Sequence, residues 1–508
     1  MGHQNFQNLV MKLLKFGVEE LFVLHYSRAS EDHRRTLLKL IGILPYDEKV
    51  ASVLFTYDLV KILLNATGLV SEAKKVDGFR VVFEALRTLH HALHVSDSVQ
   101  QIFIENCEEL LFERMKCCLS HLKEDEEVTQ KPQFYFLNNA SEILIEELLY
   151  SDLRLAFVSC LSSVKLQRKW ITDLKKANLF LDVLKYCYQK MSSTQTSYKK
   201  TTRKLMVVQT LSWAVEIIDD DENWDENVES LVIFQSFEMA ITALEVLHHL
   251  HMYAEIFNTE FAQKCANECG KIIESEFVDD DLKRVAARFL TAVPACLLPL
   301  CPKIPESESS KAKINYENYE MKFVAAVLKY LSKKLEDTDP VEIRLLTSFF
   351  VVLILLCTKH KQVRRFCRSK LIPSNNSIST LDKDLRYKII KLILTSKNFC
   401  AKQAAEFLFI LCKRSLPRLI KDTGVKHVAE LLPDNKDIYR KREGDSEDSE
   451  DENKKPKKEE STKKIQVKPE KTVSKLAPKL PKTEETKVKK LPKSEIVPEM
   501  VRKYSAKM

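Results

Sequence analysis

Three cations in this sequence are spaced so that they fall on one face of a helix. Lys361, Arg364 and Arg365 occupy positions i, i+3 and i+4 within KHKQVRRFCR, residues 359–368. Such a cluster attracts carboxylates or phosphates, and each guanidinium can bind an oxyanion through two hydrogen bonds. The spacing therefore predicts an anion-binding basic patch, although an ordinary solvated helix face has the same composition.

A matching anionic segment lies further along the chain. Residues 443–452 (EGDSEDSEDE) hold seven acidic residues and no basic residue. Ser446 and Ser449 precede acidic residues, a pattern that suits acidophilic kinases, and each phosphate would add nearly two negative charges. We expect the phosphorylated segment to fold back onto Lys361, Arg364 and Arg365. The alternative is an unmodified acidic spacer.

The sequence holds no motif of an enzyme that performs covalent chemistry. A phosphate-binding loop, GxGxxG and HExxH are all absent, and eight glycines are few for a backbone that cradles phosphates. His248, His249, His251 and Glu255 have no further ligand at a characteristic metal-site spacing, so we expect surface histidines there. We predict a protein without covalent catalysis, cofactor or metal site.

The elements that must position these residues are helices. Val82, Leu86, Leu89 and Leu93 form an apolar stripe of helical spacing, and similar stripes recur at 153–164 and 385–392. Residues 404–424 (AAEFLFILCKRSLPRLIKDTG) predict a helix, a break before Pro417 and a second short helix. A loose repeat of three helices per unit predicts an all-α fold, an armadillo/HEAT-like α-solenoid with a concave groove.

Charge divides the chain into three parts. The net charge is +8, of which +7 lies from residue 440 onward, so the body is nearly neutral. We assign residues 1–438 to the α-solenoid, 439–453 to an acidic Ser-containing segment and 454–508 to a Lys/Pro-rich disordered tail. A solenoid that binds nucleic acid would carry its positive charge on the body, so we predict no nucleic-acid partner.

Cysteine usage and hydropathy indicate the compartment. The 13 cysteines follow no regular framework and lie mostly among apolar residues, which predicts buried thiols in a reducing environment. No uncharged run is longer than residues 345–358, which is shorter than the roughly 20 residues of a spanning helix. We therefore expect a cytoplasmic protein without a transmembrane segment.

The amino-acid sequence of the C-terminal third resembles the synembryn family, also called resistance to inhibitors of cholinesterase. HKQVRRFCRSKLIP, LRYKIIKLIL, AAEFLFILC and PRLIKDTG occur in the family's order and spacing, and residues 81–101 give a weaker match. The acidic serine segment also resembles the family's phosphorylated stretch. The resemblance implies that this stretch docks on a basic patch at Lys361, Arg364 and Arg365.

The resemblance also implies a function and a partner. Synembryns are chaperones and non-receptor guanine nucleotide exchange factors for heterotrimeric G-protein α subunits (Gα). Their concave groove captures the C-terminal helix of GDP-bound or nucleotide-free Gα, which promotes GDP release. His91 is our candidate groove contact, and a buried core histidine is the alternative. We expect a monomer that Gα recruits to the cell cortex or plasma membrane.

One departure from the family bears on activity. Residues 454–508 lack the long amphipathic helix that follows the acidic stretch in synembryns, so capture of Gα is better supported than efficient exchange. Two alternatives stay open: an armadillo scaffold or transport adaptor without exchange activity, and a nuclear or nucleic-acid factor recruited through the basic tail.

Overall fold

The computed structural model describes one part of the chain in detail, and the statements below concern that part. It comprises residues 25–43, 54–70, 78–124, 132–194, 227–252, 258–305, 314–336, 339–372, 380–396 and 398–423. The chain divides into two compact units, Met1–Lys441 and Arg442–Met508. All described residues belong to the first unit, so the predicted acidic segment and tail lie outside them.

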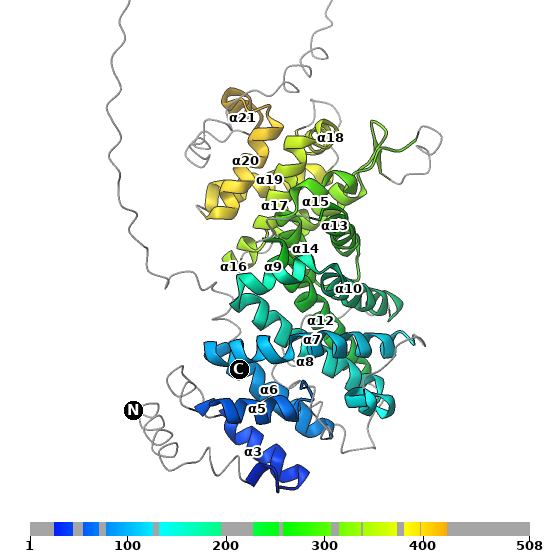
Figure 1. Cartoon of the computed structure of the whole chain (residues 1–508). Coiled ribbons are helices and arrows are strands. Elements are labelled where there is room, and N and C mark those ends of the chain that lie inside the picture. Colours follow the sequence, from blue (N-terminus) through cyan, green and yellow to red (C-terminus); the bar gives the residue numbers. More distant parts are fainter. Residues whose placement is uncertain are drawn as a thin grey trace, which may run out of the picture. The chain divides into compact units, whose positions relative to one another are not determined.

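The described residues form an all-α fold, as predicted, with one small hairpin (Figure 1). The α-helices are α3 (Glu31–Ile43), α5 (Tyr57–Ala66), α6 (Phe79–Val95), α7 (Asp97–Leu122), α8 (Glu142–Ser162), α9 (Val164–Thr172), α10 (Leu174–Thr194), α12 (Asn227–Met252), α13 (Thr259–Glu274), α14 (Asp280–Ala292), α15 (Lys322–Lys334), α16 (Pro340–Arg344), α17 (Thr347–Lys359), α18 (Lys361–Leu371), α19 (Thr380–Thr395), α20 (Phe399–Leu411) and α21 (Leu416–Thr423). The remaining elements are the 3₁₀ helices η1 (Pro132–Asn139), η3 (Pro294–Cys296) and η4 (Leu298–Leu300) and the strands β1 (Asn315–Tyr316) and β2 (Tyr319–Glu320).

Polar residues at helix ends explain where the chain breaks. Asn398 caps α20, because its side chain accepts a hydrogen bond from the amide of Ala401 at 2.9 Å. The helix ends at a left-handed turn in which Lys413 and Arg414 have φ of 56° and 52°. The predicted second short helix then follows as α21, with Pro417 in its first turn, where a missing amide costs nothing.

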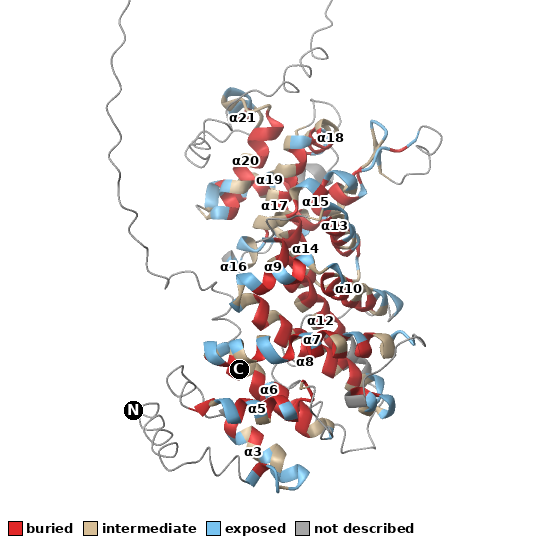
Figure 2. Ribbon diagram, viewed as in Figure 1, coloured by how far each residue is buried: buried red, intermediate tan, exposed pale blue. Residues whose placement is uncertain are grey.

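The helices pack in two rows that run along the first unit. In one row α3, α6, α8, α12, α14, α17 and α20 each contact the next helix. In the other row α5, α7, α10, α13, α15 and α19 do the same, and pairs such as α10 and α12 join the rows. Figure 2 shows buried residues where the helices face one another and exposed residues on their outer sides. Each helix therefore buries its apolar stripe against neighbours in both rows.

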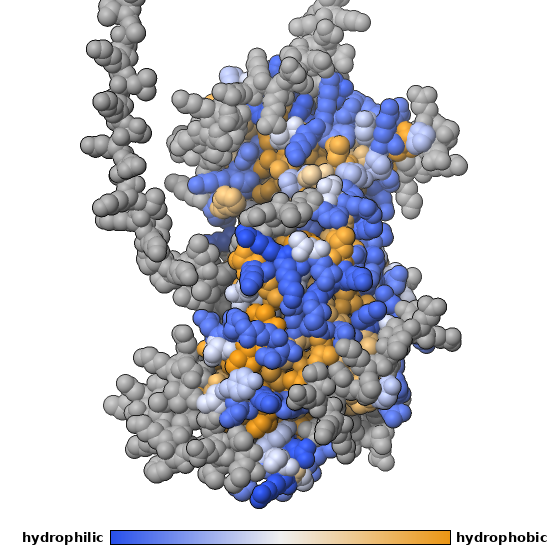
Figure 3. All heavy atoms as spheres, viewed as in Figure 1, coloured by the Kyte–Doolittle hydropathy of each residue, from blue (hydrophilic) through white to orange (hydrophobic). Residues whose placement is uncertain are grey.

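The predicted stripes supply much of this core. Val82, Leu86, Leu89 and Leu93 are all buried in α6, and all 13 cysteines are free and buried, as predicted. Val164 departs from its stripe and is exposed, because Ser163 caps a new helix there by accepting a hydrogen bond from the amide of Leu166. On the face shown in Figure 3, hydrophilic residues predominate, with hydrophobic residues visible in bands between them.

Buried charges link helices that are distant in sequence. Arg114 on α7 and Asp152 on α8 are both inaccessible to solvent and form two hydrogen bonds, at 2.8 Å and 2.5 Å. Arg114 also donates to the carbonyl oxygen of Thr67, at the end of α5. One guanidinium therefore connects three helices, and its charge is balanced by one carboxylate.

One described segment, Val341–Lys359, is long and apolar enough to cross a membrane by length and composition. In the structure the segment is interrupted between α16 and α17, and α17 packs against α14, α18 and α20. Phe349, Phe350 and Leu353 are completely buried in these contacts. We therefore interpret α17 as a core helix of the first unit.

Candidate functional site

His91 lies in a group of polar side chains contributed by two packed helices, α6 and α8. On α6 it sits beside two other histidines, whose ring centroids are 4.7 Å apart. On α8, Arg154 lies close enough to lower the pKa of His90 and to offset part of the rise in the pKa of its neighbour Glu147. We call this group the α6–α8 polar surface; its members are His90, His91, His94, Glu147 and Arg154.

Burial keeps two histidines of the α6–α8 polar surface, His90 and His94, uncharged near neutral pH. Loss of solvent, followed by the nearby charge of Arg154, lowers the pKa of His90 well below 6.5 and that of His94 to about 4. Burial raises the pKa of Glu147 to about 7, and Arg154 offsets part of that rise. The side-chain amide of Gln235 on α12 donates a hydrogen bond of 2.8 Å to Glu147.

This arrangement suits recognition of a peptide rather than covalent chemistry. A neutral imidazole both donates and accepts a hydrogen bond, and Arg154 supplies a permanent positive charge next to these rings. The sequence singled out His91 alone. Glu147 and Arg154 were missed because they lie about 60 residues from His91 in the sequence, and only the pairing of α6 with α8 brings them near it. The spacing of His90, His91 and His94 on one helix was visible in the sequence.

The histidines at 248–251, predicted to lie on the surface, are placed differently in the structure. His248 and His251 on α12 are buried rather than on the surface, and burial lowers the pKa of each. The His251 ring stacks on Phe261 at 5.7 Å and meets Phe289 edge to face. These rings therefore act as core aromatics. Within the part of the chain that the structure describes, no three metal-binding side chains gather in a group that could hold an ion.

The predicted basic patch lies on α18, but its three cations differ in their surroundings. Lys361 and Arg365 are partly exposed, whereas Arg364 is 6% exposed and donates a hydrogen bond of 3.1 Å to the carbonyl oxygen of Cys357. Arg364 therefore departs from the predicted arrangement of three cations on one solvated face. Its guanidinium fastens α18 to the end of α17.

A hairpin that the sequence did not predict covers one side of α18. Glu317 and Asn318 have φ of 49° and 63°, which gives a tight turn between β1 and β2. The turn presents the Glu317 carboxylate to Arg365 at 3.2 Å and 3.3 Å. Tyr316 and Tyr319 pack edge to face against Phe366 and His360, respectively. Ser446 and Ser449, the predicted phosphorylation sites, lie outside the described residues.

The fold defines an all-α protein built from two rows of packed helices. Comparison with known families then identifies its kind: a family model described as guanine nucleotide exchange factor synembryn matches residues 37–469. The match covers most of the chain, so the protein belongs to the synembryn (Ric8) family. The resemblance inferred from the C-terminal third is thereby confirmed and extends over both rows of helices.

Curated relatives carry the same family name. The chain is 24% identical over 451 residues to chaperone ric-8 of Caenorhabditis elegans, which covers 82% of this chain and 73% of the relative. It is 23% identical over 410 residues to chaperone Ric-8A of Danio rerio, and this alignment covers 78% of this chain and 67% of the relative. The match to chaperone Ric-8A of Macaca fascicularis is 32% identical, but it covers only 27% of this chain and 26% of the relative.

Proposed function

We propose that this protein is a chaperone and guanine nucleotide exchange factor for Gα. The observation that carries the proposal is the match of the synembryn family model to residues 37–469. Relatives that align over most of this chain are named chaperones, which supports the same role. Exchange by such a protein needs no covalent chemistry, because it acts through binding alone.

The two rows of helices support a specific mode of binding. We propose that they form an armadillo-type superhelix whose concave groove is lined by the row from α3 to α20. The unbroken contacts along each row are what stacked repeats require. The α6–α8 polar surface lies on two helices of the proposed lining row, and it would meet the end of the Gα C-terminal helix.

Charge complementarity favours this assignment. The C-terminal end of a helix carries a partial negative charge, and a chain that ends there adds its carboxylate. Arg154 offers the opposite charge, and His91 offers hydrogen bonds from the adjacent helix. Capture of the Gα helix would favour the open, nucleotide-free state, so GDP leaves and GTP binding later releases the complex.

The test is to mix the purified chain with Gα loaded with GDP. The proposal predicts a nucleotide-free complex on size exclusion and faster GTPγS uptake. His91→Ala should weaken the complex about fivefold, the value of one hydrogen bond. His25→Ala, which changes an exposed histidine that precedes α3 and belongs to neither row, is the matched control and should have no effect. If the chain neither binds Gα nor changes GTPγS uptake, the proposal is wrong.

A second candidate function is capture of Gα without efficient exchange. The composition of residues 454–508, rich in Lys and Pro and without a long amphipathic pattern, favours it. This candidate predicts the same complex with Gα but no increase in GTPγS uptake. A passive scaffold would give neither result, so the two measurements together separate the three possibilities.

We further propose that phosphorylation at Ser446 and Ser449 directs the acidic segment to α18. Lys361 and Arg365 would bind phosphate, while Arg364 holds the helix in place. Treating the chain with an acidophilic kinase should increase its activity toward Gα, and the Ser446→Ala/Ser449→Ala chain should not respond. Equal activity of the two kinase-treated chains would reject the role of these serines. We also propose a cytoplasmic monomer that Gα recruits to the cell cortex.

A further inference from the structure

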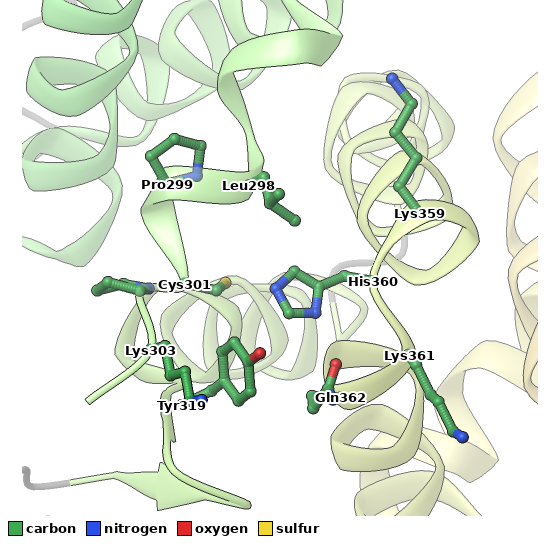
Figure 4. A pocket seen from close by; sticks show the side chains of 10 residues that line it. Leu298, Pro299, Cys301, Lys303, Tyr319, Lys359, His360, Lys361 and Gln362 are labelled. Carbon is green, nitrogen blue, oxygen red and sulfur yellow. The ribbon is translucent and has the colours of Figure 1, made fainter. Parts of the chain in front are cut away.

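An open hollow of about 480 Å³ lies where α17 meets α18 (Figure 4). One wall is the η4 turn, another is the hairpin that carries Tyr319, and the third is the junction of α17 with α18. In Figure 4 the imidazole of His360 and the hydroxyl of Tyr319 both point into the hollow. Because several segments build it, the hollow has a shape that a ligand can recognise.

Three lysines give the rim of the hollow a positive charge. Lys303 follows η4, whereas Lys359 and Lys361 flank the junction of α17 with α18. Among the residues that the structure describes, no aspartate or glutamate lines the hollow. The first turn of α18 also borders it, and His360, the N-cap residue, makes no side-chain capping bond. The amides and dipole of that turn add to the attraction for an anion.

The interior of the hollow, by contrast, is largely apolar. Leu298 is 49% exposed at its wall, beside Pro299 and Pro302. His360 and Tyr319 meet edge to face at 5.1 Å, and burial lowers the pKa of His360, which leaves a neutral ring at pH 7. A fitting ligand therefore combines an apolar or aromatic body with an anionic group at the rim.

We propose that this hollow binds a phosphate monoester with an apolar body. The ammonium groups of Lys359 and Lys361 lie away from the centre in Figure 4, but a flexible four-carbon stem lets each turn toward an anion at the rim. The hydroxyl of Tyr319 and the amide of Gln362 offer further hydrogen bonds to the phosphate. The site differs from the basic patch on α18, with which it shares only Lys361, and it does not depend on Gα binding.

The test uses phenyl phosphate as the probe and the full unphosphorylated chain. Isothermal titration should show saturable binding with a dissociation constant of roughly 1 mM or tighter, and inorganic phosphate, which lacks the apolar body, should bind more weakly. Lys303→Ala and Lys359→Ala should each weaken binding about tenfold, as expected for loss of one charged hydrogen bond. Lys402→Ala, at an exposed lysine on α20, should leave binding unchanged.

Two results would overturn the proposal. One is an absence of saturable binding by the intact chain, and the other is unchanged affinity in the Lys303→Ala/Lys359→Ala double variant. Both lysines are exposed, so the variants should fold, and circular dichroism verifies this. Association with Gα, measured on the same variants, is expected to persist, which separates failure of this site from failure of the proposed function.

Discussion

Replacing Glu147 by glutamine should stabilise the protein at neutral and alkaline pH. Burial raises the pKa of Glu147 from 4.5 to about 7, so between these values the folded protein holds a proton that the unfolded chain has released. The folded state binds more protons in this window, and stability therefore falls as the pH rises from about 4.5 to about 7. Above pH 7 the loss of folding stability caused by Glu147 is complete, whereas below pH 4.5 this loss is absent.

The magnitude follows from the two pKa values. Their difference corresponds to about 3.4 kcal/mol of unfolding free energy, and partial exposure of the side chain to solvent reduces this to about 2 kcal/mol. Glutamine has the same size and keeps an acceptor oxygen for the Gln235 amide, now 2.8 Å from Glu147. The variant should gain about 2 kcal/mol at pH 8 but less than about 1 kcal/mol at pH 5.

Urea denaturation at several pH values between 5 and 8 measures this difference. The gap in unfolding free energy between Glu147→Gln and the unchanged protein should widen steadily with pH. Glu105→Gln, on the exposed side of α7, is the matched control and should show no widening gap. A gap that stays constant across the range, or a variant that is less stable at pH 8, would show that Glu147 does not have a raised pKa in the folded protein.

Other changes have equally definite outcomes. Asp152→Asn leaves the fully buried charge of Arg114 without a counter-charge, so urea denaturation should show a loss of about 3–5 kcal/mol; a loss below about 1 kcal/mol would contradict that. Arg365→Ala removes a partly exposed pair with Glu317, and the melting curve should reveal a loss below about 1 kcal/mol. A larger loss would mean that the pair supports the hairpin.

Much of the fold follows from local features of the sequence. The stripe through Val82, Leu86 and Leu89 is buried in α6 because the residues recur at the period of a helix. The break before Pro417 follows from backbone chemistry, and α21 begins beside it. The stripe at 153–164 ends early because a capping serine starts a new helix, and that signal was present in the sequence.

Contacts between distant residues account for what could not be predicted. Arg114 and Asp152 are 38 residues apart in sequence, and only the pairing of α7 with α8 makes them partners. The burial of Arg364 likewise depends on how α18 packs onto α17, although its spacing from Lys361 was correct for one helix face. Helical periodicity predicts which residues share a face, but the packing of neighbours decides whether that face is solvated.

The most direct test of this account compares two forms of the partner. The chain is mixed with intact Gα carrying GDP and, separately, with Gα that lacks its C-terminal helix, and complex formation is measured by size exclusion with light scattering. The account predicts a nucleotide-free complex of one chain with one intact Gα and no complex with the shortened form. Equal binding of both forms would contradict capture of the C-terminal helix.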